Sequence, residues 1–281
     1  MAKNNNLVAP FLKWVGGKRQ LMPSIVEHLP ENIKNLNYSE PFIGGGAVLF
    51  HLQPKNAIIN DFNEELVNVY NVIKNNLSEL IADLKKHDNN ADYFYEIRGL
   101  DRTEQFNDLT PVQRASRIIF LNKTCFNGLW RVNSSGDFNV PSNGSKRFRI
   151  SWLALQRCWL LFRDHATLSC GGYAEFLWSK VRKGDFVFLD PPYIPLSTTS
   201  SFTSYTQDGW TDRDNLQLAD ILSQLDSIGV KFLMTNSSSP LVYELFGKWN
   251  IQEVKAHRFV KALSGSGGKR DKVEETVITN Y

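Results

Sequence analysis

The sequence predicts an α/β protein whose mostly parallel sheet carries helices on both faces. The first observation is a continuous apolar run at residues 186–189 (FVFL), which is typical of a parallel strand buried on both sides. The second is the alternation of such strand segments with stretches of helical spacing, the pattern of βαβ units. The third is a glycine-rich turn within residues 40–50 (EPFIGGGAVLF), where a short strand ends and an apolar helix opens. The 281 residues suffice for one large or two modest domains.

The strand and helix segments follow one another in a regular order. Residues 55–60 form a short apolar strand closed by Asp61, and residues 63–84 follow with one apolar stripe at helical spacing. Beyond the central strand, residues 213–225 are amphipathic, and a glycine then breaks the helix. The remaining segments predict a strand at 230–235, a short helix at 240–246, a strand at 251–256 and a last strand at 275–281.

The middle of the chain has a different character. Residues 93–121 are mostly helical in pattern, whereas residues 124–150 are rich in Asn, Gly, Ser and basic residues and predict a loop with a hairpin turn at 134–136. We therefore expect an inserted second domain at residues 67–151. The α/β domain then consists of residues 1–66 together with 152–281.

The composition excludes several classes of protein. Hydrophobic residues make up 42% and charged residues 22%, as in ordinary globular proteins, and no apolar run approaches the length of a membrane span. The apolar stretch near the N-terminus is short and broken by Pro10, so we expect no signal peptide. The three cysteines lack CxxC spacing and the five histidines are scattered, so neither a disulfide framework nor a metal site is indicated. We expect a protein of the reducing cytoplasm, without a membrane partner.

The distribution of charge is more informative than the net charge of +3. Residues 114–149 contain seven Lys/Arg and one acid, and residues 255–272 contain six Lys/Arg and one acid. Two basic segments on a nearly neutral chain are a footprint for a polyanion. Solvated loops are the alternative for either segment alone.

The glycine-rich turn and the acid after the next strand are candidates for binding a cofactor. The turn does not have GxGxxG spacing, which disfavours a dinucleotide pyrophosphate. Asp61, at the tip of the following strand, suits the hydroxyl groups of a ribose, and Phe62 could lie against an adenine ring. The alternative is that Asp61 or Asn63 caps the helix that follows.

The segment at residues 11–20 (FLKWVGGKRQ) adds a second candidate contact with a cofactor. The required GxxxxGK[ST] of a P-loop is absent, so a nucleoside triphosphate is disfavoured. The ring face of Trp14 can hold a cation such as a sulfonium, and Lys18 can pair with a carboxylate. The alternative is a buried tryptophan beside a solvent-exposed lysine.

The candidate catalytic segment, residues 190–193 (DPPY), follows the central strand. Strand ends are where α/β sheets place chemistry, and Asp190 sits at such an end. Pro191 and Pro192 fix the backbone, so a carboxylate and a carbonyl form a rigid edge of acceptors that suits an exocyclic amino group. Tyr193 offers a ring on which a base could stack, worth roughly 1–3 kcal/mol. The alternative is a plain proline turn.

Residues 123–143 contain the candidates for reading a nucleic acid. Arg131 suits a guanine edge or a phosphate. Asn127, with other asparagines of the segment, offers an amide, while Leu129 and Pro141 could touch a thymine methyl group. An ordinary polar hairpin is the alternative.

Taken together, these motifs resemble the Dam/DpnM group of DNA adenine-N6 methyltransferases, the α-type amino-methyltransferases. The resemblance covers nearly the whole chain, in the family's order: FLKWVGGKRQ, EPFIGGG, INDFN, FNGLWRVN, FNVP and DPPY, with TNSSS and VITNY near the end. It implies a Rossmann-like class I methyltransferase domain with a seven-stranded sheet, and an inserted, mainly helical target-recognition domain with a β-hairpin. It also implies S-adenosylmethionine as cofactor and double-stranded DNA, usually at GATC, as substrate.

The resemblance assigns roles to individual residues of this chain. Asp190, Pro191, Pro192 and Tyr193 would form the catalytic motif. The cofactor contacts would be Trp14, Lys18, Phe42, Gly44, Asp61, Phe62, Tyr173 and Asp190, with Asp61 on the ribose and Tyr173 on the adenine. The DNA contacts would be Lys13, Asn127, Leu129, Arg131 and Pro141.

Two departures from the family pattern stand out. Many relatives continue FNVP with an aromatic residue, Gly, Arg and Tyr, but residues 142–146 here read SNGSK, so the Arg–Tyr pair of base readers is missing. Residues 170–173 read CGGY, and lack the acid that comes before the aromatic ring in DpnM-like relatives. The recognition sequence therefore does not follow from the motifs.

The resulting hypothesis is methyl transfer to N6 of an adenine rotated out of the duplex. One alternative is a related enzyme acting on cytosine N4 or on adenine in RNA; the aspartate at position 190 favours adenine, since cytosine enzymes often have serine there. Another is a non-catalytic DNA-binding relative. We expect a monomer or a weak dimer, and the sequence does not distinguish a role in restriction from a phage or regulatory role.

Overall fold

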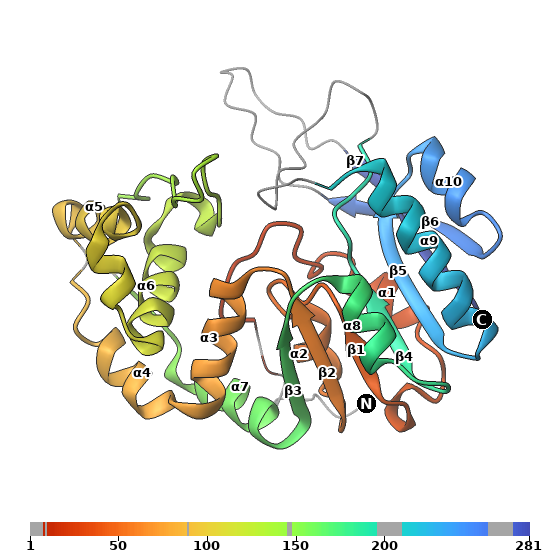
Figure 1. Ribbon diagram of the computed structural model, residues 1–281, viewed down its shortest axis with the longest axis horizontal. Helices are drawn as coiled ribbons and strands as arrows, with labels where there is room; N and C mark the ends of the chain where they lie inside the picture. Colours follow the sequence, from red (N-terminus) through yellow and green to blue (C-terminus); the bar gives the residue numbers. More distant parts are fainter. Residues whose placement is uncertain (1–7, 9, 89, 145–147, 196–209, 258–271) are drawn as a thin grey trace. The chain divides into compact units, whose positions relative to one another are not determined.

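A computed structural model describes residues 8, 10–88, 90–144, 148–195, 210–257 and 272–281 (Figure 1). Within these residues the strands form a seven-stranded sheet in the order β3-β2-β1-β4-β5-β7-β6. Their bounds are β1 (Tyr38–Glu40), β2 (Ala57–Asp61), β3 (Ala166–Cys170), β4 (Phe186–Leu189), β5 (Lys231–Ser237), β6 (Asn250–His257) and β7 (Lys272–Thr279).

The sheet is mixed, and most of its pairs are parallel. The pairs β2–β3, β1–β4 and β4–β5 are parallel, while β7 runs antiparallel to both β5 and β6. The order 3-2-1-4-5 is that of a doubly wound Rossmann sheet, in which ligands bind outside the carboxyl ends of the strands. The predicted Rossmann-like α/β fold is therefore confirmed, with the antiparallel β7 as an addition that the segment pattern did not predict.

The helices alternate with the strands and also fill the middle of the chain. They are α1 (Met22–Glu27), α2 (Ala47–Leu52), α3 (Glu64–Asn75), α4 (Leu77–Leu84), α5 (Ala91–Gly99), α6 (Pro111–Thr124), α7 (Trp152–His165), α8 (Tyr173–Lys180), α9 (Asp212–Ser227) and α10 (Pro240–Phe246). Short 3₁₀ turns are η1 (Ile33–Asn35), η2 (Leu100–Arg102), η3 (Glu104–Asp108) and η4 (Phe126–Gly128). None of the helices in the described residues is long and apolar enough to cross a membrane.

By their internal contacts the residues divide into two compact units. Unit 1 comprises Met1–Gly17 and Phe42–Phe176, and unit 2 comprises Lys18–Pro41 and Leu177–Tyr281. In unit 1, α3 packs against α6 and α7, and α4 and α5 pack against α6 (Figure 1). In unit 2, α9 packs against α10 and β5. The predicted boundaries of an inserted domain at 67–151 stay a prediction.

Local sequence explains the elements that position the site. All four side chains of β4 are at most 1% exposed, as a strand covered on both faces requires. Helix α6 begins with a capping box, in which the Thr110 side chain accepts from the Gln113 N–H and Gln113 binds back, and Pro111 occupies its first turn. The helix predicted at 63–84 is wrong in one respect: it breaks at Asn76, whose φ of −134° and ψ of 37° are not helical.

Parts of both basic segments lie outside the described residues. These parts are residues 145–147 of the first segment and 258–271 of the second. The structure therefore describes residues 114–144 and 148–149 of the first segment, and residues 255–257 and 272 of the second.

Candidate active site and target-recognition segment

Asp61 ends β2 in unit 1 and is held by main-chain donors on both of its oxygens. The Gly44 N–H donates to Asp61 Oδ2 at 2.9 Å, and the Asn63 N–H donates to Oδ1 at 3.0 Å. Burial raises the pKa of the Asp61 carboxyl, and these hydrogen bonds oppose the rise. The cap of α3 is Asn63, whose side chain accepts from the Leu66 N–H at 2.9 Å. Since a carboxylate offers about four acceptor positions, Asp61 can still accept hydroxyl groups.

Gly44 allows the glycine-rich turn to lie against Trp14. Its φ of +47° is in the left-handed region, and a Cβ at this position would lie 3.0 Å from Trp14 Cδ1. The Tyr70 hydroxyl donates a hydrogen bond to the Gly44 carbonyl, and this bond restrains the turn. The Trp14 ring also stacks on Trp130, with centroids 5.9 Å apart and planes 13° apart. Trp14 is thus half-buried between a glycine turn and a second indole, rather than in the apolar core.

A pair of aromatic rings lies near the ends of the strands of unit 1. Phe42 and Tyr173 have ring centroids 5.3 Å apart at 32°. The end of β3 is tied to β2, because the Gly171 N–H donates to the Asp61 carbonyl at 3.1 Å. Phe62 is 59% exposed, so its ring is accessible to a ligand. The structure thus brings Phe42 and Tyr173 together.

Asp190 follows β4 in unit 2 and lies beside a buried lysine. Lys18 Nζ is 2.6 Å from Asp190 Oδ1, and the Thr235 hydroxyl donates to the same oxygen at 3.0 Å. Burial raises the pKa of the Asp190 carboxyl, while Lys18 and Thr235 lower it. Lys18 is only 7% exposed, so the alternative of a solvent-exposed lysine is wrong.

Tyr193 is held by its hydroxyl and by a cation near its ring. The hydroxyl donates to Glu275 Oε2 at 2.7 Å, and Lys18 Nζ lies 4.6 Å from the ring centroid. Burial, Asp190 and Glu275 hold the pKa of Tyr193 well above its usual range, so the phenol stays neutral. The sequence offered no sign of Glu275, which enters from β7.

The backbone beyond Pro192 is fixed by two buried side chains of β5. The Ile194 N–H donates to Asn236 Oδ1 at 3.1 Å, and the Ser237 hydroxyl donates to the Ile194 carbonyl at 2.6 Å. Both residues belong to the TNSSS stretch, whose role the sequence left open. Segment 190–194 is therefore fixed at both ends, as the stiff edge predicted from its prolines requires.

Arg131, one of the predicted DNA-contacting residues, lies on an irregular hairpin of unit 1. An isolated antiparallel bridge joins Val132 to Phe138, and the Gly136 N–H donates to the Asn133 carbonyl at 3.0 Å, which confirms the turn predicted at 134–136. Arg131 is exposed, and its Nε donates to Asn139 Oδ1 at 2.7 Å. The other predicted contacts are placed as follows: Lys13, Asn127 and Pro141 are exposed, and Leu129 is half-buried.

Asn122 is a buried polar residue that connects the two sequence motifs of unit 1. Its Oδ1 accepts the Lys13 N–H at 2.9 Å, and its Nδ2 donates to the carbonyls of Lys13 at 2.7 Å and Gly128 at 3.1 Å. Gly128 has a φ of +66°, and a Cβ there would lie 2.5 Å from Lys13 Cδ. Segments 11–20 and 126–133 are therefore in direct contact, which neither motif alone predicted.

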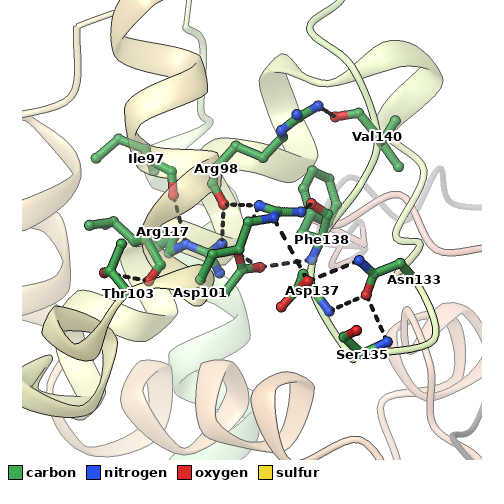
Figure 2. Close-up of polar contacts among 12 residues, drawn as sticks. Ile97, Arg98, Asp101, Thr103, Arg117, Asn133, Ser135, Asp137, Phe138 and Val140 are labelled. Atoms are coloured by element: carbon green, nitrogen blue, oxygen red, sulfur yellow. Dashed lines mark hydrogen bonds and ion pairs between the residues drawn. The ribbon is translucent and has the colours of Figure 1, made fainter.

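The basic segment at 114–149 exposes fewer basic side chains than its composition predicts. Arg117 is 4% exposed and pairs with Asp101 at 2.8 Å, and Arg114 pairs with Glu65 (Figure 2 shows the Arg117 contacts). Both arginines are therefore paired with acids of the protein itself, Arg117 in the interior and Arg114 at the surface. Of the described Lys and Arg residues in the segment, Arg131 and Arg149 are exposed. The polyanion footprint thus rests on fewer cations than we expected.

Two groups of residues could hold a cofactor and a substrate base. One is Asp61, Gly44, Trp14, Phe42 and Tyr173 in unit 1, and the other is Asp190, Lys18, Tyr193, Thr235 and Glu275 in unit 2. The first offers a carboxylate, a bare glycine turn and aromatic faces, which fit a nucleoside. Among the described residues, no group of three or more His, Cys, Asp or Glu could hold a metal ion.

Comparisons with known proteins agree on one family. A family model described as D12 class N6 adenine-specific DNA methyltransferase matches residues 14–260. The chain is 43% identical to Type II methyltransferase M1.LlaDCHI of Lactococcus lactis subsp. cremoris, over 100% of this chain and 98% of the relative. It is 40% identical to Type II methyltransferase M.MjaIII of Methanocaldococcus jannaschii, over 98% and 99%. It is 33% identical to the DNA adenine methylase of Salmonella typhi, over 94% and 92%.

Proposed function

The chain belongs to the D12 class N6 adenine-specific DNA methyltransferases, and we propose that it transfers a methyl group from S-adenosylmethionine to an adenine rotated out of double-stranded DNA. The family establishes an enzyme that methylates adenine in DNA, and its sheet is the Rossmann-like sheet of a methyltransferase. The methyl donor, the residues that hold it and the recognition sequence are the proposed parts.

The residues of unit 1 fit the nucleoside part of the proposed donor. Asp61 would accept the ribose hydroxyls, because the main-chain donors on its carboxylate leave part of its acceptor capacity for a ligand. Tyr173, beside Phe42, would stack on the adenine, and Trp14 would face the sulfonium. S-adenosylmethionine supplies an electrophilic methyl group when bound.

The residues of unit 2 fit the amino group that accepts the methyl. Both described contacts of Asp190 engage Oδ1, so we assign Oδ2 to the N6 hydrogen of the target adenine. Lys18 and Thr235 favour the ionised carboxylate, the form that accepts this hydrogen. The Pro191 carbonyl would take the second N6 hydrogen. Together these acceptors lie where positive charge develops on nitrogen, and the proton leaves to water afterwards.

Stacking on Tyr193 would offset the cost of rotating the adenine out. Unstacking and unpairing cost roughly a few kcal/mol, and stacking on an aromatic ring is worth about 1–3 kcal/mol per base. The Glu275 bond and the fixed Ile194 backbone hold the ring in place before the base arrives. Positioning the two reactants supplies most of the acceleration in this mechanism.

The cluster of Asp190, Lys18 and Tyr193 at the end of β4 is the observation that carries the proposal. The test is to incubate the purified protein with unmethylated plasmid DNA or with RNA and S-adenosylmethionine, and to analyse nucleosides by mass spectrometry. We expect N6-methyladenine in DNA. N4-methylcytosine, a product in RNA alone, or no product would each reject the assignment.

The base-reading role of the hairpin and the target site are part of the same proposal. Arg131 would contact a guanine edge or phosphate, with Leu129 and Pro141 against bases, Asn127 and Lys13 nearby, and GATC or a related short site as the target. Methylation-aware sequencing of DNA from cells expressing the protein gives the site directly. Action in the cytoplasm and a monomeric or weakly dimeric state stay predictions.

A further inference from the structure

The strand of the hairpin that faces Arg131 is held by charged side chains rather than by a neighbouring sheet strand. Asp101 Oδ2 accepts the Phe138 N–H at 2.7 Å, and Arg102 Nη2 donates to the Phe138 carbonyl at 2.8 Å. Two residues on, Arg98 Nη1 contacts the Val140 carbonyl at 3.5 Å. Figure 2 shows these contacts converging on the hairpin from α5 and η2.

Asp101 is the centre of this network. Its Oδ2 also lies 2.8 Å from Arg117 Nη2, and its Oδ1 accepts from Arg102 Nη1 at 3.0 Å. The buried Arg117 further donates to the carbonyls of Ile97 and Arg98, both at 2.8 Å. One carboxylate thus contacts two guanidinium groups and accepts a hydrogen bond from the hairpin backbone. Removing it would leave the buried charge of Arg117 without its partner, which is costly.

Because side chains alternate along residues 138–140, fixing Phe138 and Val140 also fixes the direction of the Asn139 side chain. Phe138 and Val140 are 0% and 1% exposed and pack in a cluster with Phe94 and Phe120. Asn139, between them, therefore points the other way, as successive residues of an extended chain do. Its N–H donates to the Arg131 carbonyl at 3.1 Å, and its Oδ1 accepts from Arg131 Nε at 2.7 Å.

We propose that Asp101 is a positioning residue for DNA site selection, which fixes Phe138 and, through Asn139, orients the Arg131 guanidinium. The proposal rests on the proposed function, and specifically on the role of Arg131 in reading DNA. With Nε bound to Asn139, the two terminal amino groups of Arg131 remain in a fixed plane for a bidentate contact. Sequence discrimination then depends on a carboxylate that does not touch DNA.

The test compares Asp101→Ala, Asp101→Asn and Arg131→Ala with the wild-type protein on unmethylated plasmid DNA. Single-molecule sequencing gives the rate of adenine methylation at the preferred site and at sites that differ by one base. We expect the ratio of these rates to fall roughly tenfold in Asp101→Ala. Asp101→Asn keeps an acceptor for the Phe138 N–H, so we expect partial rescue. S-adenosylmethionine affinity should not change in either variant.

Asp226→Ala is the matched control for a loss of stability alone. Asp226 is half-buried in unit 2 and accepts bonds from Trp249 Nε1 and Asn280 Nδ2, both at 2.8 Å. Its loss should lower the unfolding midpoint without changing the ratio of rates. An equal change of the ratio in Asp226→Ala, or an unchanged ratio in both Asp101 variants, would overturn the proposal.

The outcomes also separate this inference from the proposed function. If Arg131→Ala loses discrimination while Asp101→Ala and Asp101→Asn keep it, only the role of Asp101 is rejected. If Asp101→Ala does not fold, Asp101→Asn decides, because it retains the shape and the hydrogen-bond acceptor. If the wild-type protein forms no N6-methyladenine, the proposed function and this inference fall together.

Discussion

Segment 190–194 in unit 2 and the hairpin 131–140 in unit 1 each present polar side chains, but they are fixed by different means. Segment 190–194 continues a strand covered on both faces, carries two prolines, and is fixed by the β5 side chains of Asn236 and Ser237. The hairpin has one isolated bridge and depends on Asp101 and its arginines.

The two ways of holding polar side chains suit the two tasks that we propose for these segments. In the proposed mechanism, segment 190–194 positions an amino group in the same way at every target site, and the backbone beyond a central strand is rigid enough for that task. The hairpin, to which we assign the reading of DNA, is held by side chains, so substitutions can change its support without disturbing the sheet.

The largest expected effect is that of Asp190→Ala. The variant should keep DNA and cofactor binding but lose methyl transfer by roughly a hundredfold to a thousandfold, because an acceptor for the N6 hydrogen is gone. Single-turnover kinetics with unmethylated DNA, together with separate binding measurements, check this. Robust turnover in the variant would contradict the catalytic role of Asp190.

Next in size is Arg131→Ala, which perturbs the hairpin. Loss of a bidentate base contact costs about 1–3 kcal/mol of discrimination, so site preference should weaken by roughly tenfold to a hundredfold while cofactor affinity stays constant. Methylation rates on plasmid DNA, read site by site, measure this. If site preference stays unchanged, the target-reading segment is misplaced. Arg149→Ala, the removal of another exposed arginine, is the control for charge.

Asn122→Ala should weaken the contact between Lys13, beside the proposed cofactor residue Trp14, and Gly128, which precedes the hairpin. We expect S-adenosylhomocysteine to strengthen DNA binding in the wild-type protein, and this factor to fall about fivefold in the variant. Equilibrium DNA binding with and without S-adenosylhomocysteine measures it. Asn280→Ala is matched, since Asn280 makes three bonds, to Phe232, Asp226 and Val230. Equal factors in both variants would reject the connection.

Thr235→Val tests how Thr235 affects the pKa of the Asp190 carboxyl. In the proposed mechanism the acceptor is the ionised Asp190 carboxylate, whose pKa burial raises, so kcat should fall on acidification at a pH above the ordinary aspartate range. Thr235 lowers that pKa, so the variant should move the acid limb of the kcat profile to higher pH. Thr124→Val, another buried threonine, should leave the limb in place. A shift to lower pH, or none, contradicts the assignment.

The smallest expected effect concerns the stability of unit 1, and it arises from His87. His87 is stacked on Phe120 and bonded to Tyr93 and Ser116, and burial lowers the pKa of its imidazole from 6.5 to about 4, with Asp83 and Lys86 nearby. Its contribution to stability is complete above pH 6.5 and declines as pH falls from 6.5 towards 4, because the unfolded state binds the proton first.

The measurement is urea unfolding of the wild-type protein and of His87→Gln across this pH range. The variant should show a flatter dependence of the unfolding free energy on pH. Parallel curves would show that His87 does not titrate on unfolding.

The sheet was largely predictable from the sequence, because its central strands carry strong local signals. The run at β4 is apolar on both faces, and the predicted segments around β2, β5, β6 and β7 correspond to strands with small shifts of their ends. By contrast, β3 and α7 were missed: β3 buries only its first residue, so its burial has no regular alternation. The break at Asn76 was missed because the apolar stripe continues from Ile73 to Leu77 and Leu80.

The sequence predicted the motifs of the candidate site, but it did not predict which of their side chains contact one another. Residues 190–193 were identified at the end of β4, and the positions of Asp61 and Gly44 agree with a cofactor turn. The pairing of Lys18 with Asp190 joins residues far apart in the chain, so no local pattern indicates it. Asn122 did leave a signal, since it is a polar residue within a run of buried ones in α6.

The charged support of the hairpin has a practical consequence for engineering. A transplant of residues 131–140 into a relative would carry Arg131 and Asn139 but leave Asp101, Arg102 and Arg117 behind. The exchangeable module for altering site preference therefore extends from α5 through the hairpin, and chimaeras should be cut at its outer ends.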